Sequence, residues 1–118
     1  MAKIDEREVL VTEERERLRE LFKEIPSNKI KVVEGLIVQA ARLRVLLNEM
    51  WIDITENGDY ELFSQSDKTD PYERERPVAR LYNTRDQSYQ RIIKQLTDLL
   101  PVDTANKEEI KRSATDLL

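Results

Sequence analysis

The chain has 118 residues, with 20 Lys and Arg against 24 Asp and Glu, and it contains no Cys and no His. This composition excludes disulfides, zinc sites built on Cys or His, and catalytic triads that need either residue. With 37% charged residues and only 2 glycines, it favours one small, mostly helical domain over a sandwich or barrel. No apolar run reaches the roughly 18 residues of a membrane span. The first 25 residues hold 14 charges, unlike a targeting peptide, so we expect a soluble cytoplasmic protein.

The first predicted helix covers about residues 12–25. Thr12 suits the N-cap position, and the two glutamates that follow it suit the positive end of a helix dipole. Residues 1–11 show no clear period, so we predict a flexible tail or a frayed extension of the helix. The apolar side chains of this helix have helical spacing and are Leu18, Leu21, Phe22 and Ile25.

The second predicted helix covers about residues 28–56. Pro26 breaks the first helix, and Ser27 or Asn28 is expected to cap the second. Gly35 in its interior suggests that another helix approaches closely there. Two apolar stripes run side by side along this helix. The first is a heptad seam of Val33, Leu36, Ala40, Leu43, Leu47, Met50 and Ile54; the second comprises Ile30, Ile37, Ala41 and Val45.

The end of this helix has two interpretations within residues 51–63. Asn57-Gly58 is a strong signal for a β-hairpin turn. The heptad phase, however, continues to Ile54, and Gly58 suits the left-handed position just past a helix C-terminus. We prefer a helix to about residue 56. Residues 59–76 then form a connection, in which Asp70 to Glu73 could make one helical turn.

The third predicted helix covers about residues 77–100, with Pro77 in the first turn and Pro101 after the end. Residues 102–118 form either a short helix or a tail that folds on binding. The expected fold is all-α: a long antiparallel helical hairpin crossed by the first helix. The seam of the third helix is interrupted by Arg85 and consists of Val78, Tyr82, Tyr89, Ile92, Leu96 and Leu99, widened by Leu81, Ile93 and Leu100.

The two stripes of the second helix are more than one partner helix can cover, so we predict a homo-oligomer. The alternative is a monomeric four-helix bundle. Trp51 is either an interface anchor or an ordinary core residue. Tyr82 and Tyr89 are expected at the edge of the core with their hydroxyls in water, rather than as platforms on which bases stack.

Charge is distributed unevenly. Residues 74–94 hold 6 basic and 2 acidic side chains, whereas residues 51–73 hold 1 basic and 7 acidic. Repeated around an oligomer, the basic side chains could bind phosphates; otherwise they form salt bridges with the acidic segment and the first helix. On charge alone, the candidate DNA-binding residues are Arg42, Arg44, Arg74, Arg76, Arg80, Arg85, Arg91 and Lys94.

Other functional signals are weak. The acidic cluster of Asp53, Glu56, Asp59 and Glu61 lacks the spacing of a calcium loop and reads better as a solvated helix end. Phosphate-binding and dinucleotide-binding glycine motifs are absent, and no paired carboxylates suggest acid–base catalysis. No recognition helix of a helix-turn-helix is evident. We therefore expect no catalytic residues, no cofactor and no metal.

Four short motifs follow one another along residues 18–101: Val33-Glu-Gly-Leu-Ile37, Asn57-Gly58, Pro77-Val78 leading to Tyr82-Asn83, and Leu96-Thr-Asp-Leu-Leu-Pro101. In this order they resemble the small terminase subunits of tailed phages and prophages of Gram-positive bacteria. The resemblance implies a non-catalytic DNA-packaging protein in the bacterial host cytoplasm. It implies a ring oligomer that binds double-stranded DNA and recruits the large terminase subunit, which carries the ATPase and nuclease.

The resemblance supplies no motif-matched contact residues, so the DNA-binding set rests on charge. Many small terminases have a separate N-terminal DNA-binding domain, whereas only the charged residues 1–25 stand in that place here. The alternative function is an oligomeric helical scaffold or regulatory protein that binds other proteins and not DNA. Salt-sensitive DNA binding distinguishes the two.

Overall fold

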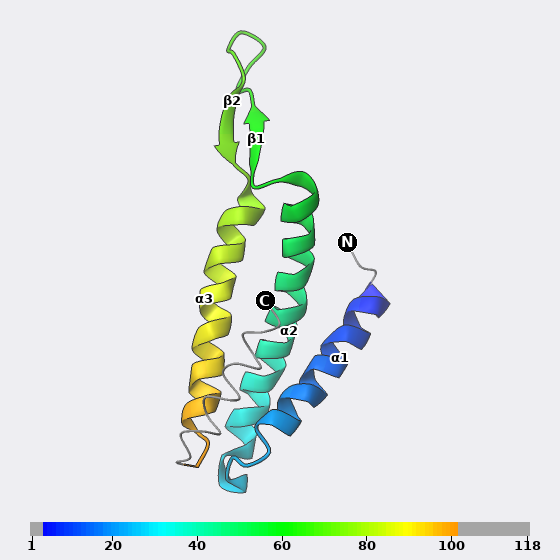
Figure 1. Ribbon diagram of the computed structural model, residues 1–118, viewed down its shortest axis with the longest axis vertical. Coiled ribbons are helices and arrows are strands. Elements are labelled where there is room, and N and C mark those ends of the chain that lie inside the picture. Colours follow the sequence, from blue (N-terminus) through cyan, green and yellow to red (C-terminus); the bar gives the residue numbers. More distant parts are fainter. Residues whose placement is uncertain (1–3, 102–118) are drawn as a thin grey trace.

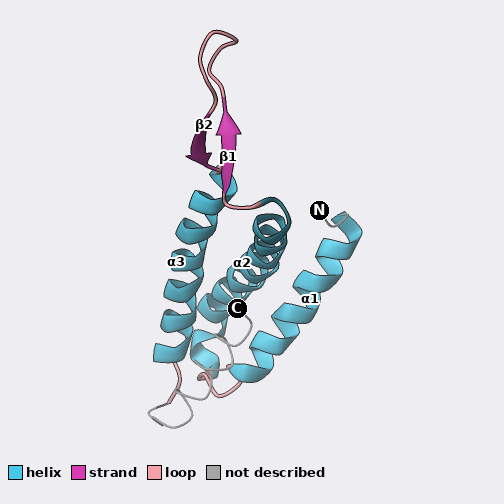
Figure 2. Ribbon diagram, turned by 45° about the horizontal axis from the view of Figure 1, so that its top comes forward, coloured by secondary structure: helices cyan, strands magenta, loops and turns pink. Residues whose placement is uncertain are grey.

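Three helices dominate the structure, a computed structural model that describes residues 4–101. Helix α1 (Ile4–Leu21) leads through a short 3-10 turn (Ser27–Lys29) to α2 (Ile30–Asn57). Helix α3 (Pro77–Asp98) returns alongside α2 in the opposite direction. Helix α1 lies against the N-terminal half of α2 and diverges from it toward its own N-terminus (Figures 1 and 2). The mostly helical fold expected from the sequence is confirmed.

The core lies where α2 meets α3 and α1. Four seam residues of α2 are buried (Val33, Ala40, Leu47, Met50), while Leu36 and Leu43 are partly buried against the core and Ile54 is half-buried. On α3, Tyr89 and Leu96 are fully buried. The second stripe of α2 supplies Ile37, Ala41 and Val45 to the same core, whereas Ile30 is exposed. The remaining α3 seam residues are partly buried: Val78, Tyr82, Ile92 and Leu99.

Helix α1 begins at Ile4, eight residues earlier than predicted, so of the two alternatives for residues 1–11 the structure shows the helical extension over residues 4–11. Thr12 is not an N-cap but an interior residue, whose hydroxyl donates a hydrogen bond to the Glu8 carbonyl at 2.9 Å. The apolar periodicity did not predict helix over residues 4–11, because these residues bury few side chains. Val11, seven residues before the buried Leu18, is the one buried side chain there. The helix ends at Leu21, and Phe22 completes its buried stripe.

Helix α2 matches its predicted limits to within two residues. Its N-terminus has no side-chain cap, so the expected cap from Ser27 or Asn28 is not made. At the other end, Gly58 adopts φ +82° and its N–H donates to the Ile54 carbonyl at 2.8 Å. The preference for a helix end over a hairpin turn at this position is confirmed, because the positive φ suits glycine.

The connection after Gly58 contains an antiparallel β-hairpin that the sequence did not reveal. Strand β1 (Tyr60–Phe63) pairs with β2 (Tyr72–Glu75), and the helical turn predicted at residues 70–73 is therefore wrong. The hairpin projects beyond the ends of α2 and α3 (Figure 1). Side-chain pairing explains the strands: the Phe63 and Tyr72 rings meet edge to face at 5.9 Å, and the Arg74 guanidinium lies 3.5 Å from the Phe63 ring centre.

Helix α3 begins at Pro77, as predicted, and ends at Asp98, two residues before the predicted limit. Leu99 and Leu100 continue in a tighter turn, in which Leu100 is buried. The short helix or tail predicted for residues 102–118 lies outside the described residues.

Gly35 does not mark a close helix approach. It is exposed on α2, and a Cβ atom added there would meet nothing within 4 Å. The sequence-based interpretation of this glycine is therefore wrong, and its flexibility is a cost to the helix without a packing benefit.

We expect Gly35→Ala to raise the free energy of unfolding by about 0.5–1 kcal/mol, because alanine loses less backbone entropy in a helix. Urea unfolding followed by circular dichroism measures the change. Gly58→Ala is the matched control and should destabilise the protein, since its φ of +82° strains any residue with a Cβ. A destabilised Gly35→Ala variant would contradict the open surroundings of this position.

Candidate functional site

One exposed face of α3 carries a row of basic and polar side chains. Arg80 and Arg91 are eleven residues apart, which is close to three full turns, so both point the same way. Lys94 extends the row by one turn. Among residues 4–101, Arg91 has no salt bridge, Arg80 approaches Glu75 only at 3.6 Å, and Lys94 pairs with Asp98 at 3.3 Å. The row, called here the α3 basic face, comprises the exposed residues Arg80, Thr84, Gln87, Arg91 and Lys94.

Two other predicted DNA-binding residues are held by carboxylates at the base of the hairpin. Arg76 binds the Asp53 carboxylate at 2.9 Å and the Gly58 carbonyl at 2.6 Å. Arg74 binds Glu61 at 2.9 Å across the two strands. These contacts pair arginines of the basic segment, residues 74–94, with carboxylates of the acidic segment, residues 51–73, within one chain. Both arginines therefore stabilise the hairpin and its base.

The carboxylate of Asp53 responds to this pairing. Hydrogen bonds from Arg76 and then from Asn57 lower the pKa of Asp53 below its ordinary value. Ionised Asp53 therefore stabilises the folded base of the hairpin more than protonated Asp53 does. Because both partners keep contact with water, the pair fixes geometry more than it adds stability.

Arg44 is a correction to the predicted DNA-binding set. It is 2% exposed, so its guanidinium cannot reach a phosphate on the surface. The group lies 5.0 Å from the Tyr89 ring centre and donates to the Asn48 side chain at 3.2 Å. In the part of the chain that the structure describes, its Nε and Nη1 atoms have no hydrogen-bond partner. The sequence contains a pattern that indicates this burial. Arg44 follows Ile37 by seven residues and Ala41 by three, so it lies on the same helix face as the second apolar stripe.

The remaining basic candidates differ in their surroundings. Arg42 is exposed on α2. Arg85 is half-buried, and its guanidinium contacts the Met50 sulfur at 3.6 Å. Within the described part of the chain, neither has a salt bridge.

The three aromatic candidates, Tyr82, Tyr89 and Trp51, differ in how deeply the fold buries them. Tyr89 is fully buried and its hydroxyl has no hydrogen-bond partner among residues 4–101, so the prediction that this hydroxyl reaches water is wrong. Burial raises the pKa of the Tyr89 phenol above its ordinary value. Tyr82 is half-buried and packs against Trp51, with ring centres 5.8 Å apart. Trp51 is 55% exposed, which rules out an ordinary core position.

The acidic cluster does not form a cation site in residues 4–101, where no group of three metal-ligating side chains comes together. Asp53 and Glu61 are taken by Arg76 and Arg74. Glu56 and Asp59 are exposed at the end of α2 and just past it. The interpretation as a solvated helix end agrees with this arrangement.

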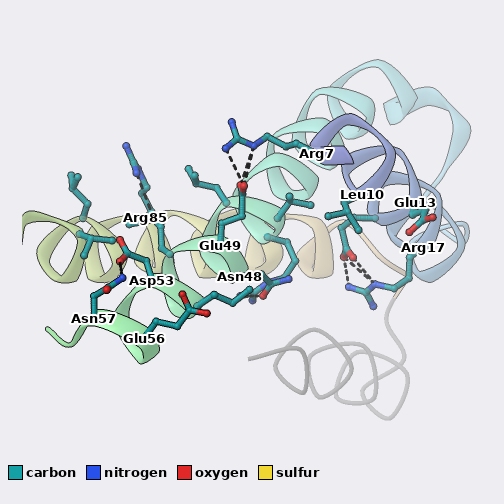
Figure 3. A pocket seen from close by; sticks show the side chains of 18 residues that line it. Arg7, Leu10, Glu13, Arg17, Asn48, Glu49, Asp53, Glu56, Asn57 and Arg85 are labelled. Atoms are coloured by element: carbon teal, nitrogen blue, oxygen red, sulfur yellow. Dashed lines mark hydrogen bonds and ion pairs between the residues drawn. The ribbon is translucent and has the colours of Figure 1, made fainter. Parts of the chain in front are cut away.

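A groove of about 880 Å³ separates the diverging half of α1 from α2 and α3. Arg7 reaches across it from α1 and binds Glu49 of α2 at 3.0 Å (Figure 3). Exposed apolar side chains from all three helices, Leu10, Ile52 and Leu81, line it together. Sequence analysis missed this groove, because it depends on the angle between α1 and α2.

No family model, no curated protein and no solved structure matches this chain. Within residues 4–101, no helix has both the length and the apolar character to cross a membrane.

Arg76→Ala should loosen the hairpin, because it removes the contacts to Asp53 and Gly58 together. We expect faster amide hydrogen exchange in residues 60–75 and little change in α2 and α3. Arg80→Ala is the control, since Arg80 is exposed. In the wild type, slow exchange in the hairpin depends on the ionised form of Asp53. The protection is complete above the ordinary pKa of an aspartate and is lost as the pH falls through the lowered pKa of Asp53. Unchanged exchange in Arg76→Ala would contradict the anchoring role.

Tyr89→Phe should raise the free energy of unfolding by about 1 kcal/mol, because it removes a buried hydroxyl that has no partner. The wild type should also lose stability as pH rises from about 10 through the raised pKa of Tyr89, since only the unfolded phenol ionises readily. Tyr89→Phe should lack this alkaline loss. Urea unfolding at pH 7 and pH 10.5 measures both effects, with Tyr82→Phe as the control; destabilisation at pH 7 would show a hidden partner for the hydroxyl.

Proposed function

We propose that this chain is a small terminase subunit, a non-catalytic DNA-packaging protein that oligomerises, binds double-stranded DNA and recruits a large terminase subunit. The order of motifs along residues 18–101 supports the family assignment. The α3 basic face is the observation that carries the DNA-binding part. It presents positive and hydrogen-bonding side chains along about 20 Å of one helix, which suits contact with a phosphate backbone.

Exposed apolar side chains support the oligomeric part of this proposal. Trp51, Val32 and Ile30 of α2 are each more than half exposed, as are Ile4 and Val9 of α1. Residues 4–101 of one chain leave these surfaces to water, and burial between subunits would remove that cost. Closed symmetry would then repeat the α3 basic face around the assembly and raise the local positive potential.

An oligomeric helical scaffold that binds proteins and not DNA is the second candidate. Arg74 and Arg76 favour it, because carboxylates of the same chain already neutralise both. The exposed Tyr60 and Leu62 of the hairpin favour it too, since apolar side chains on a projecting element suit contact with another protein.

A DNA titration at several salt concentrations distinguishes the candidates. For the wild type we expect affinity that falls steeply as salt rises. The double variant Arg80→Ala, Arg91→Ala should bind more weakly, with a salt slope reduced by about 1–2 for each subunit that contacts DNA. The matched control, Lys23→Ala with Lys68→Ala, removes the same charge from exposed sites outside α3.

Native mass spectrometry of the same samples measures the number of subunits. An assembly that binds no DNA at low salt would favour the scaffold. Equal losses in the two double variants would show that net charge matters and that the α3 basic face does not.

A further inference from the structure

The groove between α1 and the α2–α3 pair has an apolar floor that residues 4–101 leave open. Leu10, Ile52 and Leu81 all line it and are 45%, 56% and 43% exposed. Val45 and Met50 continue the floor toward the core. An open apolar surface of this kind, shared by three helices, is typical of a surface that another segment covers.

Two guanidinium groups in the groove lack a carboxylate within the described residues. Arg44 is buried, with two nitrogen atoms unpartnered, and Arg85 contacts only the Met50 sulfur. The other two groove arginines are satisfied, because Arg7 binds Glu49 and Arg17 binds Glu14. Carboxylates line the groove as well, and Glu13 and Glu56 have no salt bridge within residues 4–101. A segment that fits the groove should therefore bring apolar side chains and an acidic side chain placed next to Arg85.

The chain itself continues past this point with such a segment. Residues 102–118 follow Pro101, just past the end of α3 that lies away from the hairpin (Figure 1). Leu81 lies 19 residues before Leu100, or about 28 Å back along α3 and the tight turn that follows it. Seventeen residues reach about 25 Å as a helix and up to about 56 Å when extended, so the segment is long enough to return to the groove.

The sequence of this segment also fits the groove. Ile110, Ala114 and Leu117 have the spacing of one helical face. In a helix that ran back along α3 from Leu100, Leu117 would reach the level of Leu81 to Arg85, and the carboxylate of Asp116 would come near Arg85. A tethered segment needs little intrinsic affinity, because its effective concentration near its own chain is in the millimolar range.

We propose that residues 102–118 occupy the groove of their own chain, with Ile110, Ala114 and Leu117 on its apolar floor. This inference goes beyond the packaging role and does not depend on it. The segment covers Leu10, Ile52 and Leu81 and holds the diverging half of α1 in place. A groove filled in this way is unavailable to a second copy.

Disulfide trapping tests the proposal in the full-length chain, which has no cysteine of its own. The variant Leu81→Cys, Leu117→Cys joins groove and segment. The control Asn83→Cys, Leu117→Cys places the first cysteine two residues along α3, on an exposed side that does not line the groove. We expect the Leu81 pair to close within one chain at least about tenfold faster than the control pair. Equal rates, or disulfides only between chains, would overturn the proposal.

Hydrogen exchange gives a second measurement that needs no cysteine. In the wild type, amides of residues 105–118 should exchange at least about tenfold more slowly than in an unstructured peptide. Ile52→Asp should abolish this protection, since it puts a charge on the apolar floor, while Val32→Asp, at an exposed site outside the groove, should not. Exchange at unstructured rates in the wild type would overturn the proposal.

Discussion

The structure depends on one constraint, which is that α2 carries two apolar stripes and needs a partner for each. Helix α3 contributes three buried apolar side chains to the core, Tyr89, Ile93 and Leu96. Helix α1 contributes two, Val11 and Leu18, with Leu21 partly buried against the core. Since a thin stripe covers a wide one only in part, α1 diverges from α2 and the groove opens between them. Groove, exposed apolar residues and expected self-association all follow from this mismatch.

Ion pairs set the positions that hydrophobic packing leaves undetermined. Arg19 binds Glu34 at one end of the α1–α2 contact, and Arg7 binds Glu49 near the other. The Arg19 guanidinium lowers the pKa of Glu34, as Arg76 does for Asp53. Exposed pairs of this kind add little stability, because water screens the attraction between the charges. Their value here is geometric, because each one fixes the register of two helices or of helix and hairpin.

Periodicity was sufficient for the helices that carry long seams. The limits of α2 and the start of α3 follow from the heptad spacing, Pro77 and Gly58. Periodicity failed where a segment buries few side chains, or where its structure depends on contacts between residues far apart in the sequence. The first turns of α1 bury almost nothing, and the hairpin depends on cross-strand contacts of Phe63 that no linear pattern displays. For the site, charge counting could not separate the buried Arg44 from the exposed Arg80 and Arg91, although the second stripe distinguishes them.

The hairpin also bears on how the chain folds. Joining α2 to α3 through the 19 residues 58–76 would carry the entropy cost of a long open loop. Pairing of the strands draws its two ends together, and the Arg76 N–H closes the base on the Asp59 carbonyl at 2.8 Å. The effective loop shortens by two to three doublings, which lowers the cost of closure by about 1.5 kcal/mol. Early formation of the β1–β2 hairpin would thus bring the apolar seams of α2 and α3 together and speed the docking of these two helices.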